Sequence, residues 1–406
     1  MVKCFVTGDN HFGRKFNAVL GEKKEELTEA RYESLSNMVR HANDENCDLF
    51  FVTGDLFEKT DLIYIGGNNQ EKGKEVVRRV VSILKDFKND VLIIPGNHDY
   101  DDGSSSVWME FRRQIAGYNN ILVLNEFKPW NLGEINGSEV VVYSAYCQNM
   151  DSETNNLGWI NPESIEKNNT INIGLAHGTI EEVSQDNEGK YFYMSKEELN
   201  NIPVDVWFIG HAHSTYPKNI YEDRDTRNEK IYNAGTHQPI HINAKNDGFG
   251  FIVKIEKTGE KAEISARKWR SGVVFFSEIT VNSTAKEENS FRQALEKEVE
   301  ELKKKYDPEK CIIRVAIKGS AKPEEYQQKE EIYEELTKDF LFRYPPEWGE
   351  FVEEITTDKI KQEFNEKSLV ALFLNSFIED EEKDPEVNKA ELNMAYDLIR
   401  DIAKGK

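Results

Sequence analysis

Five short apolar runs along the chain end in the same kind of polar cluster. "VKCFVTGD" ends at Asp9, "CDLFFVTGD" at Asp55, "DVLIIPGNHD" at Asp99, "INIGLAHG" at Gly178 and "VDVWFIGHAH" at His213. Each run has the length of a strand, is rich in β-branched or aromatic residues, and stops at glycine and polar residues. The pattern predicts five buried strands.

Helical periodicity separates the first three of these runs. Residues 25–46 and 71–88 carry apolar side chains at the spacing of one helix face. Strands that alternate with helices predict a layered α/β domain. Ligands of such sheets bind beyond the carboxyl ends of the strands, so we expect the five polar clusters to meet there.

The pattern changes in the second half of the chain. Between residues 220 and 282, "KIYNAG", "GFGFIVKIE", "AEISARKW" and "VVFFSEITV" predict consecutive strands that close the sheet. Residues 283–310 then predict a charged helix, "CIIRVAIKG" a strand, and residues 323–339 another helix. We place a domain boundary near residue 280. Two final helices are predicted over 358–378 and 385–404, the second with Asp384 as N-cap and Pro385 in its first turn.

Length and composition narrow the class of protein. A chain of 406 residues is too long for one ordinary core, so two or more domains are expected. We find no apolar run of about 20 residues, no export signal and no CxxC pair, which predicts a reduced, cytoplasmic protein without a membrane span. The net charge of −22 opposes binding to nucleic acid by bulk electrostatics. Binding to DNA would need bound cations or a basic partner.

The polar clusters contain seven candidate metal ligands. This mix of carboxylate, amide and imidazole donors suits Mn, Fe or Zn better than calcium. Seven ligands are too many for one such ion, and they fit two ions that share a bridging carboxylate. The candidates are Asp9, His11, Asp55, Asn97, His177, His211 and His213.

The order "GDNH…GD…GNHD…H…GHAH" resembles the calcineurin-type binuclear metallophosphoesterases. Within that superfamily, "DNHFG", "GDLF" and the closing "YNAGTHQPIHINAKNDGFGFIVKIE" are similar to SbcD-type nucleases of DNA double-strand-break repair. The phosphoesterase resemblance covers residues 1–280. It implies a layered β-sandwich flanked by helices, followed by a small α/β capping domain and a helical C-terminal tail.

The resemblance also implies a division of the ligands. Asp9, His11 and His213 are expected to hold the first ion and Asn97, His177 and His211 the second, with Asp55 as the bridge. Two divalent ions, expected to be Mn²⁺, would then act on a phosphodiester.

Two residues beside these ligands are candidates for catalysis. His98 follows a ligand without being expected to bind metal, and its imidazole is predicted to protonate the leaving group or to stabilise phosphate charge. Asp99 is predicted to fix the tautomer of His98 through the other ring nitrogen. The alternative is that His98 and Asp99 only brace the turn.

The function expected from these features is DNA cleavage, by exonuclease or endonuclease action, with an SMC-like ATPase of the SbcC type as partner. Residues 281–345 are then the capping domain that recognises DNA, and 346–406 the helical region that docks the ATPase. A homodimer is left open. The alternatives are a phosphatase or phosphodiesterase for small phosphate esters, and a scaffold subunit that has lost catalysis.

A few residues keep two interpretations. His237 and His241 belong to the surroundings of the metals or to a surface loop, and Arg14 and Lys15 contact a phosphate backbone or form surface ion pairs. Glu58 stands where many of these nucleases have a histidine, three residues after the bridging aspartate, which predicts modest exonuclease activity. Its carboxylate would hold a water at the metals, pair with Lys59 or an arginine, or face solvent.

Overall fold

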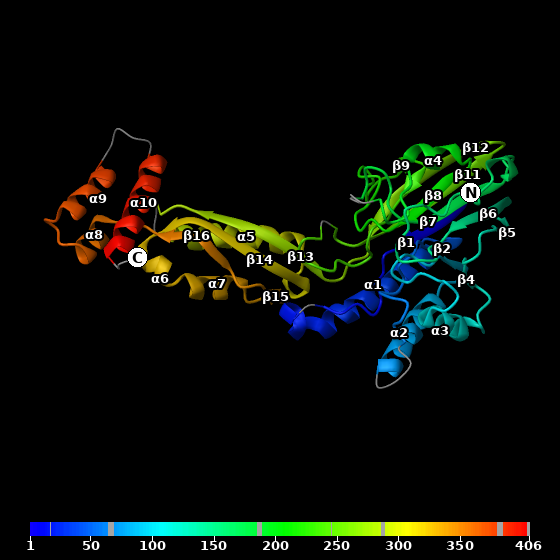
Figure 1. Cartoon of the computed structure of the whole chain (residues 1–406), viewed down its shortest axis with the longest axis horizontal. Helices are drawn as coiled ribbons and strands as arrows, with labels where there is room; N and C mark the ends of the chain where they lie inside the picture. Colours follow the sequence, from blue (N-terminus) through cyan, green and yellow to red (C-terminus); the bar gives the residue numbers. More distant parts are fainter. Residues whose placement is uncertain are drawn as a thin grey trace. The chain divides into compact units, whose positions relative to one another are not determined.

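The computed structural model of the chain describes residues 1–16, 18–63, 69–184, 189–244, 246–285, 289–379 and 385–403. They form two compact units (Figure 1). The first unit comprises Met1–Ser277 with Lys310–Ile312, and the second comprises Glu278–Glu309 with Ile313–Lys406. The predicted N-cap Asp384 lies outside the described residues.

The first sheet of the first unit has the strand order β4-β3-β2-β1-β11-β12-β9. Its first four strands are parallel, and β11 pairs antiparallel with β1. The central pair, β1 and β2, carries two of the predicted polar clusters at its carboxyl end. The bounds are β1 (Val2–Thr7), β2 (Leu49–Val52), β3 (Asp90–Ile93), β4 (Ile121–Val123), β9 (Thr226–Arg227), β11 (Phe249–Thr258) and β12 (Lys261–Arg270).

The second sheet has the order β10-β8-β7-β6-β5. Strands β6, β7, β8 and β10 are parallel, and β5 returns antiparallel to β6. The bounds are β5 (Pro129–Ile135), β6 (Ser138–Ala145), β7 (Ile171–His177), β8 (Val206–Gly210) and β10 (Ile231–Tyr232).

The two sheets pack face to face around an apolar core. Phe51 of the first sheet contacts Phe208 of the second, with ring centroids 5.1 Å apart, among fully buried valines and leucines of both. Helices cover the outer faces: α1 (Lys24–Asp44), α2 (Asn69–Leu84) and α3 (Ser106–Ile115) the first sheet, and α4 (Lys196–Asn201) the second. Short 3-10 turns are η1 (Ala18–Lys23) and η2 (Pro162–Ser164). The predicted class, a layered α/β sandwich flanked by helices, is confirmed.

One prediction about the sheet is wrong. The four runs after residue 220 do not close a single sheet: β10 joins β8, β11 and β12 join β1, and β13 (Phe275–Ser283) pairs with β14 in the second unit. Periodicity shows which face of a strand is buried, but the choice of neighbouring strand depends on contacts distant in sequence.

The second unit contains its own sheet of four strands. Helix α5 packs on it with a buried apolar stripe formed by Phe291, Leu295, Val299 and Leu302. The bounds are α5 (Ser290–Lys305), η3 (Pro308–Lys310), β14 (Cys311–Ala321), α6 (Pro323–Gln327), α7 (Lys329–Thr337), β15 (Phe342–Arg343) and β16 (Glu347–Glu353).

Three helices follow: α8 (Thr357–Glu363), α9 (Leu369–Glu379) and α10 (Pro385–Ala403). The single helix predicted over 358–378 is therefore two helices. At the break, Asn365 Oδ1 accepts the backbone N–H of Lys367 at 3.0 Å, and Ser368 Oγ accepts that of Ala371 at 3.1 Å. These side chains replace helical hydrogen bonds and interrupt the helix.

Two further sequence expectations meet the structure here. Among the described residues, no helix combines the length and the apolar character that a membrane crossing requires. All four cysteines are free and buried. His41 of α1 is partly buried, because its ring stacks on that of Trp269 with centroids 4.4 Å apart.

Candidate metal centre

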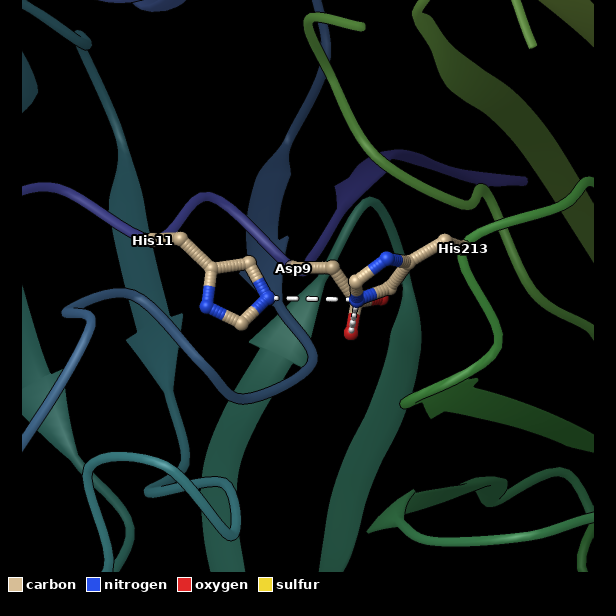
Figure 2. Close-up of side chains that lie close together, drawn as sticks. All are labelled: Asp9, His11 and His213. Atoms are coloured by element: carbon tan, nitrogen blue, oxygen red, sulfur yellow. Dashed lines mark hydrogen bonds and ion pairs between the residues drawn. The ribbon is translucent and has the colours of Figure 1, made fainter. Parts of the chain in front are cut away.

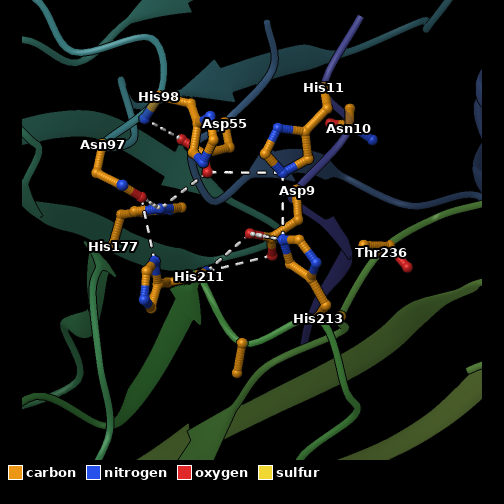
Figure 3. Close-up of polar contacts among 12 residues, drawn as sticks. Asp9, Asn10, His11, Asp55, Asn97, His98, His177, His211, His213 and Thr236 are labelled. Carbon is orange, nitrogen blue, oxygen red and sulfur yellow. Dashed lines mark hydrogen bonds and ion pairs between the residues drawn. The ribbon is translucent and has the colours of Figure 1, made fainter. Parts of the chain in front are cut away.

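The loops that follow five parallel strands bring all seven candidate ligands together (Figure 3). Asp9 and His11 follow β1, Asp55 follows β2 and Asn97 follows β3. His177 is the last residue of β7, and His211 and His213 follow β8. Because both sheets are parallel near this edge, the strands deliver their side chains to one place.

Close backbone packing holds these loops against one another. The N–H groups of Asp9 and His11 donate to the carbonyls of Gly54 and Asp55, at 3.1 and 2.8 Å. A Cβ at Gly96 would overlap the Asp55 carboxylate, so glycine is needed there for close approach. Gly96 is not among the glycines with positive φ, so close approach rather than turn geometry explains this residue.

The first group of candidate ligands is Asp9, His11 and His213, whose donor atoms lie within 4.8 Å of one another (Figure 2). The Nε2 atoms of His11 and His213 are 3.2 Å apart, and Nε2 of His213 is 3.9 Å from Oδ1 of Asp9. Two imidazole nitrogens and a carboxylate oxygen thus point at the same spot, which favours a cation between them.

The second group shows the same convergence. His177 Nδ1 lies 2.8 Å from the carbonyl oxygen of Thr53, which can only accept, so Nδ1 carries a proton. The other nitrogen, Nε2, then faces two acceptors, Asn97 Oδ1 at 3.0 Å and Asp55 Oδ2 at 3.4 Å. His211 Nδ1 also lies 3.1 Å from Asn97 Oδ1. A bound cation satisfies this cluster of electron-pair donors.

The close packing of these charged groups shifts the pKa values of the buried carboxylates and of His177. Burial, together with the charge of Asp55, raises the pKa of Asp9 to about 8. Burial lowers the pKa of His177, but the Asp55 carboxylate outweighs it and raises that pKa to about 9. Burial also favours a higher pKa for Asp55, but the nearby His177 and His11 outweigh burial. The pKa of Asp55 therefore lies well below its usual range. Protons thus balance charge where divalent ions would otherwise do so. The residues present fit two such ions.

Asp99 has a different role from the one predicted. Its carboxylate is buried and accepts the backbone N–H groups of Gly96 at 2.7 Å and Phe57 at 2.9 Å. The Nδ1 atom of His98 lies instead 3.2 Å from the backbone carbonyl of Glu58. Asp99 therefore braces the turn, and the prediction that it fixes the tautomer of His98 is wrong. The reason is that its side chain points back toward the loop after β2.

His98 itself lies beside the ligands. Its backbone N–H donates to Asp55 Oδ1 at 2.8 Å, and its ring is 4.8 Å from that of His11. A nitrogen of His98 also lies within 4.8 Å of donor atoms of His11 and Asp55. An imidazole at this distance can reach a group bound by the ions.

The residues with two interpretations now have positions. Glu58 pairs with Arg14 at 3.4 Å and with His11 at 3.2 Å, while Lys59 pairs with Asp61. Burial raises the pKa of Glu58, but the His11 contact outweighs it, so the net shift is downward. His237 is buried beneath the site, and His241 and Lys15 are exposed.

Sequence reasoning missed two residues that the structure brings to this region, Arg31 and Tyr191. Arg31 of α1 is buried and donates to the backbone carbonyl of Asn10, which stands between two ligands. The ring of His237, already a candidate from the sequence, lies 3.1 Å from the Arg31 carbonyl. Tyr191 is 40% exposed, with its ring 5.4 Å from that of His211. Neither Arg31 nor Tyr191 belongs to a strand-end motif, so only the polar character of a predicted helix or loop position could have indicated them.

Fold and site together define a metal-dependent hydrolase with its centre at the carboxyl ends of a β-sandwich. The family model described as calcineurin-like phosphoesterase matches residues 2–215, more than half of the chain. The chain belongs to this family, whose members typically use two divalent metal ions.

Solved structures give a wider comparison. A dimetal phosphatase from Danio rerio is similar at 11% identity and a TM-score of 0.35, over 65% of this chain and 98% of that one. A Thermus thermophilus protein is similar at 12% identity and a TM-score of 0.32, over 58% and 89% of the two chains. A comparison with curated protein sequences gave no match.

Proposed function

We propose that this protein is a metal-dependent DNA nuclease that works in double-strand-break repair with an SMC-like ATPase of the SbcC type. In this proposal, the seven candidate ligands hold two Mn²⁺ ions. The proposal also places the protein in the cytoplasm. The observation that carries it is the second folded unit, which lies wholly beyond the family-matched residues. We expect a hydrolase of small esters to need no such unit, whereas the unit would suit a nuclease as a cap over its DNA substrate.

The chemistry follows from the two groups of ligands. When bound, two such ions hold phosphodiester oxygens and lower the pKa of an attacking water. The chain's own residues would position the substrate and protonate its leaving oxygen. The Glu58 carbonyl can only accept, so the Nδ1 atom of His98 carries a proton. His98 must therefore be an imidazolium to protonate a leaving oxygen from Nε2.

Docking of the ATPase is proposed for the last helices. Ala371, Leu374, Leu392 and Tyr396 form a small shared core. Other apolar side chains of the same helices are exposed, among them Leu369 at 84%, Leu372 at 59% and Met394 at 76%. An apolar helical face of this kind suits a coiled-coil partner.

A substrate comparison tests the enzyme. With Mn²⁺, we expect cleavage of plasmid and duplex DNA to exceed hydrolysis of bis(p-nitrophenyl) phosphate at equal phosphate concentration, and EDTA to stop both. Faster turnover of the small diester, with DNA left intact, would favour the alternative of a small-ester phosphodiesterase. Inactivity on both would favour a scaffold subunit.

A second experiment tests the partner. Deleting residues 346–406 would remove β16, which pairs with β14, so point substitutions are cleaner. Leu372→Glu should abolish co-purification with an SMC-like ATPase from the same organism when the two proteins are co-expressed. The control Lys367→Glu places a charge at an exposed position just before α9 and should leave co-purification intact. Unchanged co-purification of the Leu372 variant would refute this docking surface.

A further inference from the structure

The carboxylate of Glu58 lies behind a candidate metal ligand. Its Oε2 atom is 3.2 Å from Nδ1 of His11 and 3.4 Å from a guanidinium nitrogen of Arg14. The Glu58 side chain is 26% exposed, whereas His11 is fully buried. Glu58 therefore closes the solvent side of the imidazole, opposite the metal centre.

Paired loop backbones fix this geometry. Phe12 N–H donates to the carbonyl of Leu56 at 2.9 Å, and Glu58 N–H donates to that of Phe12 at 3.0 Å. Together with the bonds of Asp9 and His11 described above, they form a short ladder between the loops after β1 and β2. Arg14 donates to the same oxygen, Oε2 of Glu58, at 3.4 Å, which limits the rotamers of the Glu58 side chain.

The contact has a chemical consequence for His11. The contact is an ion-pair distance of 3.2 Å, and the buried Nδ1 of His11 makes no hydrogen bond to another group among the described residues. The negative charge of Glu58 attracts a proton donor, so it favours the tautomer of His11 with hydrogen on Nδ1. The free electron pair then belongs to Nε2, the atom that faces His213 Nε2 at 3.2 Å and Asp55 Oδ2 at 3.7 Å. Nε2 is therefore the atom available to the first ion.

We infer that Glu58 is a positioning residue that orients and polarises His11 for the first metal ion. Carboxylates behind metal-binding histidines fix the tautomer and raise the basicity of the ligand, and their loss typically weakens metal binding by about 10- to 100-fold. The inference rests on the two-ion site of the proposed function but not on its DNA substrate.

Calorimetric titration of metal-free protein with Mn²⁺, without DNA, tests this role. In Glu58→Ala, we expect one of the two binding events to weaken by about 10- to 100-fold and the other to stay unchanged. Glu58→Gln should lose less, because an amide oxygen still accepts from Nδ1. The matched control is Asp61→Ala, which removes one nearby negative charge from a half-exposed pair with Lys59 and should bind both ions like the wild type.

Four outcomes would overturn the inference. They are wild-type affinity in Glu58→Ala, an equal loss at both ions, the same loss in Asp61→Ala, and no Mn²⁺ binding by the wild type. Far-UV circular dichroism and urea unfolding in EDTA show whether the variants are folded, and Glu58→Gln provides the test if Glu58→Ala is not. Only the absence of wild-type Mn²⁺ binding would also refute the proposed function, whereas a wild type that binds two ions and leaves DNA intact refutes that function alone.

Discussion

The two ring nitrogens of His98 have different neighbours. Nδ1 is held by the Glu58 carbonyl, which leaves Nε2 as the atom for proton transfer. His98→Asn should lower kcat by about 10²-fold or more, the scale for a lost general acid, with both ions still bound. Turnover measured beside metal content checks this. Loss of an ion from the variant would make His98 a ligand instead.

Gly96 makes a second prediction at the residue scale. A methyl group there would overlap both the carboxylate and the backbone nitrogen of Asp55. Gly96→Ala should therefore displace Asp55, the proposed bridge, weaken binding of both ions and remove most activity. Gly103→Ala is the control for adding a methyl group to a nearby glycine, since that position has open space, although its positive φ adds some strain. Full Mn²⁺ affinity in the Gly96 variant would contradict the packing argument.

The seven candidate ligands could be found from sequence because each stands at the end of an apolar strand. The surroundings of those ligands could not. Asp99 follows His98 directly, yet its side chain turns to the amides of Gly96 and Phe57. Arg31 reaches the site from a helix 21 residues after Asn10. Side-chain direction in a loop and contacts between distant segments have no period in the sequence.

At the scale of elements, a buried ion pair connects the two sheets. Lys257 of β11 contacts Asp205, just before β8, at 2.9 Å, and also donates to the Thr170 carbonyl at 2.6 Å. Their side chains are only 2% and 8% exposed. Lys257→Met should lower the free energy of unfolding by about 3–5 kcal/mol, because Asp205 stays buried without its partner.

Urea unfolding in EDTA measures that change. Lys261→Met serves as the control, because its pair with Glu263 is exposed and should matter little. Equal midpoints for the two variants would show that the buried pair does not stabilise the sandwich.

Elements with strong periodicity were predictable, whereas partners and breaks were not. Helices α1 and α2 and strands β1, β2, β3, β7 and β8 lie where apolar spacing places them. The partner of β13 depends on a strand that follows it by 28 residues, which periodicity cannot reveal. The break between α8 and α9 depends on two local side-chain hydrogen bonds within a continuous apolar stripe.

At the scale of the whole molecule, ions bound at the candidate metal centre should stabilise the folded state. Ions that bind only the folded chain raise its free energy of unfolding, by about 2.7 kcal/mol per site at one hundred times Kd. The melting temperature of the first unit should therefore rise with Mn²⁺ and fall in EDTA, and Asp55→Asn should lose most of this response. Scanning calorimetry measures it, and identical melting with Mn²⁺ and EDTA would contradict a two-ion site.

Charge gives a second prediction at this scale. Residues 281–406 carry 21 basic and 31 acidic residues, and the rest of the chain is also acidic. The isolated chain should therefore bind duplex DNA weakly, with little dependence on salt, and the ATPase partner should strengthen binding. Fluorescence anisotropy at two salt concentrations checks this. Tight, strongly salt-dependent binding by the chain alone would reveal a basic surface that its overall charge conceals.

Four of the seven candidate ligands have a left-handed backbone: φ is 51° at Asp9, 49° at His11, 51° at Asp55 and 101° at His211. Asparagine tolerates that conformation better than most residues and has the shape of aspartate. A lineage that abandoned catalysis could therefore exchange Asp9 and Asp55 for asparagine and keep its loops, whereas alanine would disturb them. Relatives that have become inactive should be recognisable by asparagine at these two positions within an otherwise unchanged pattern of strand-end motifs.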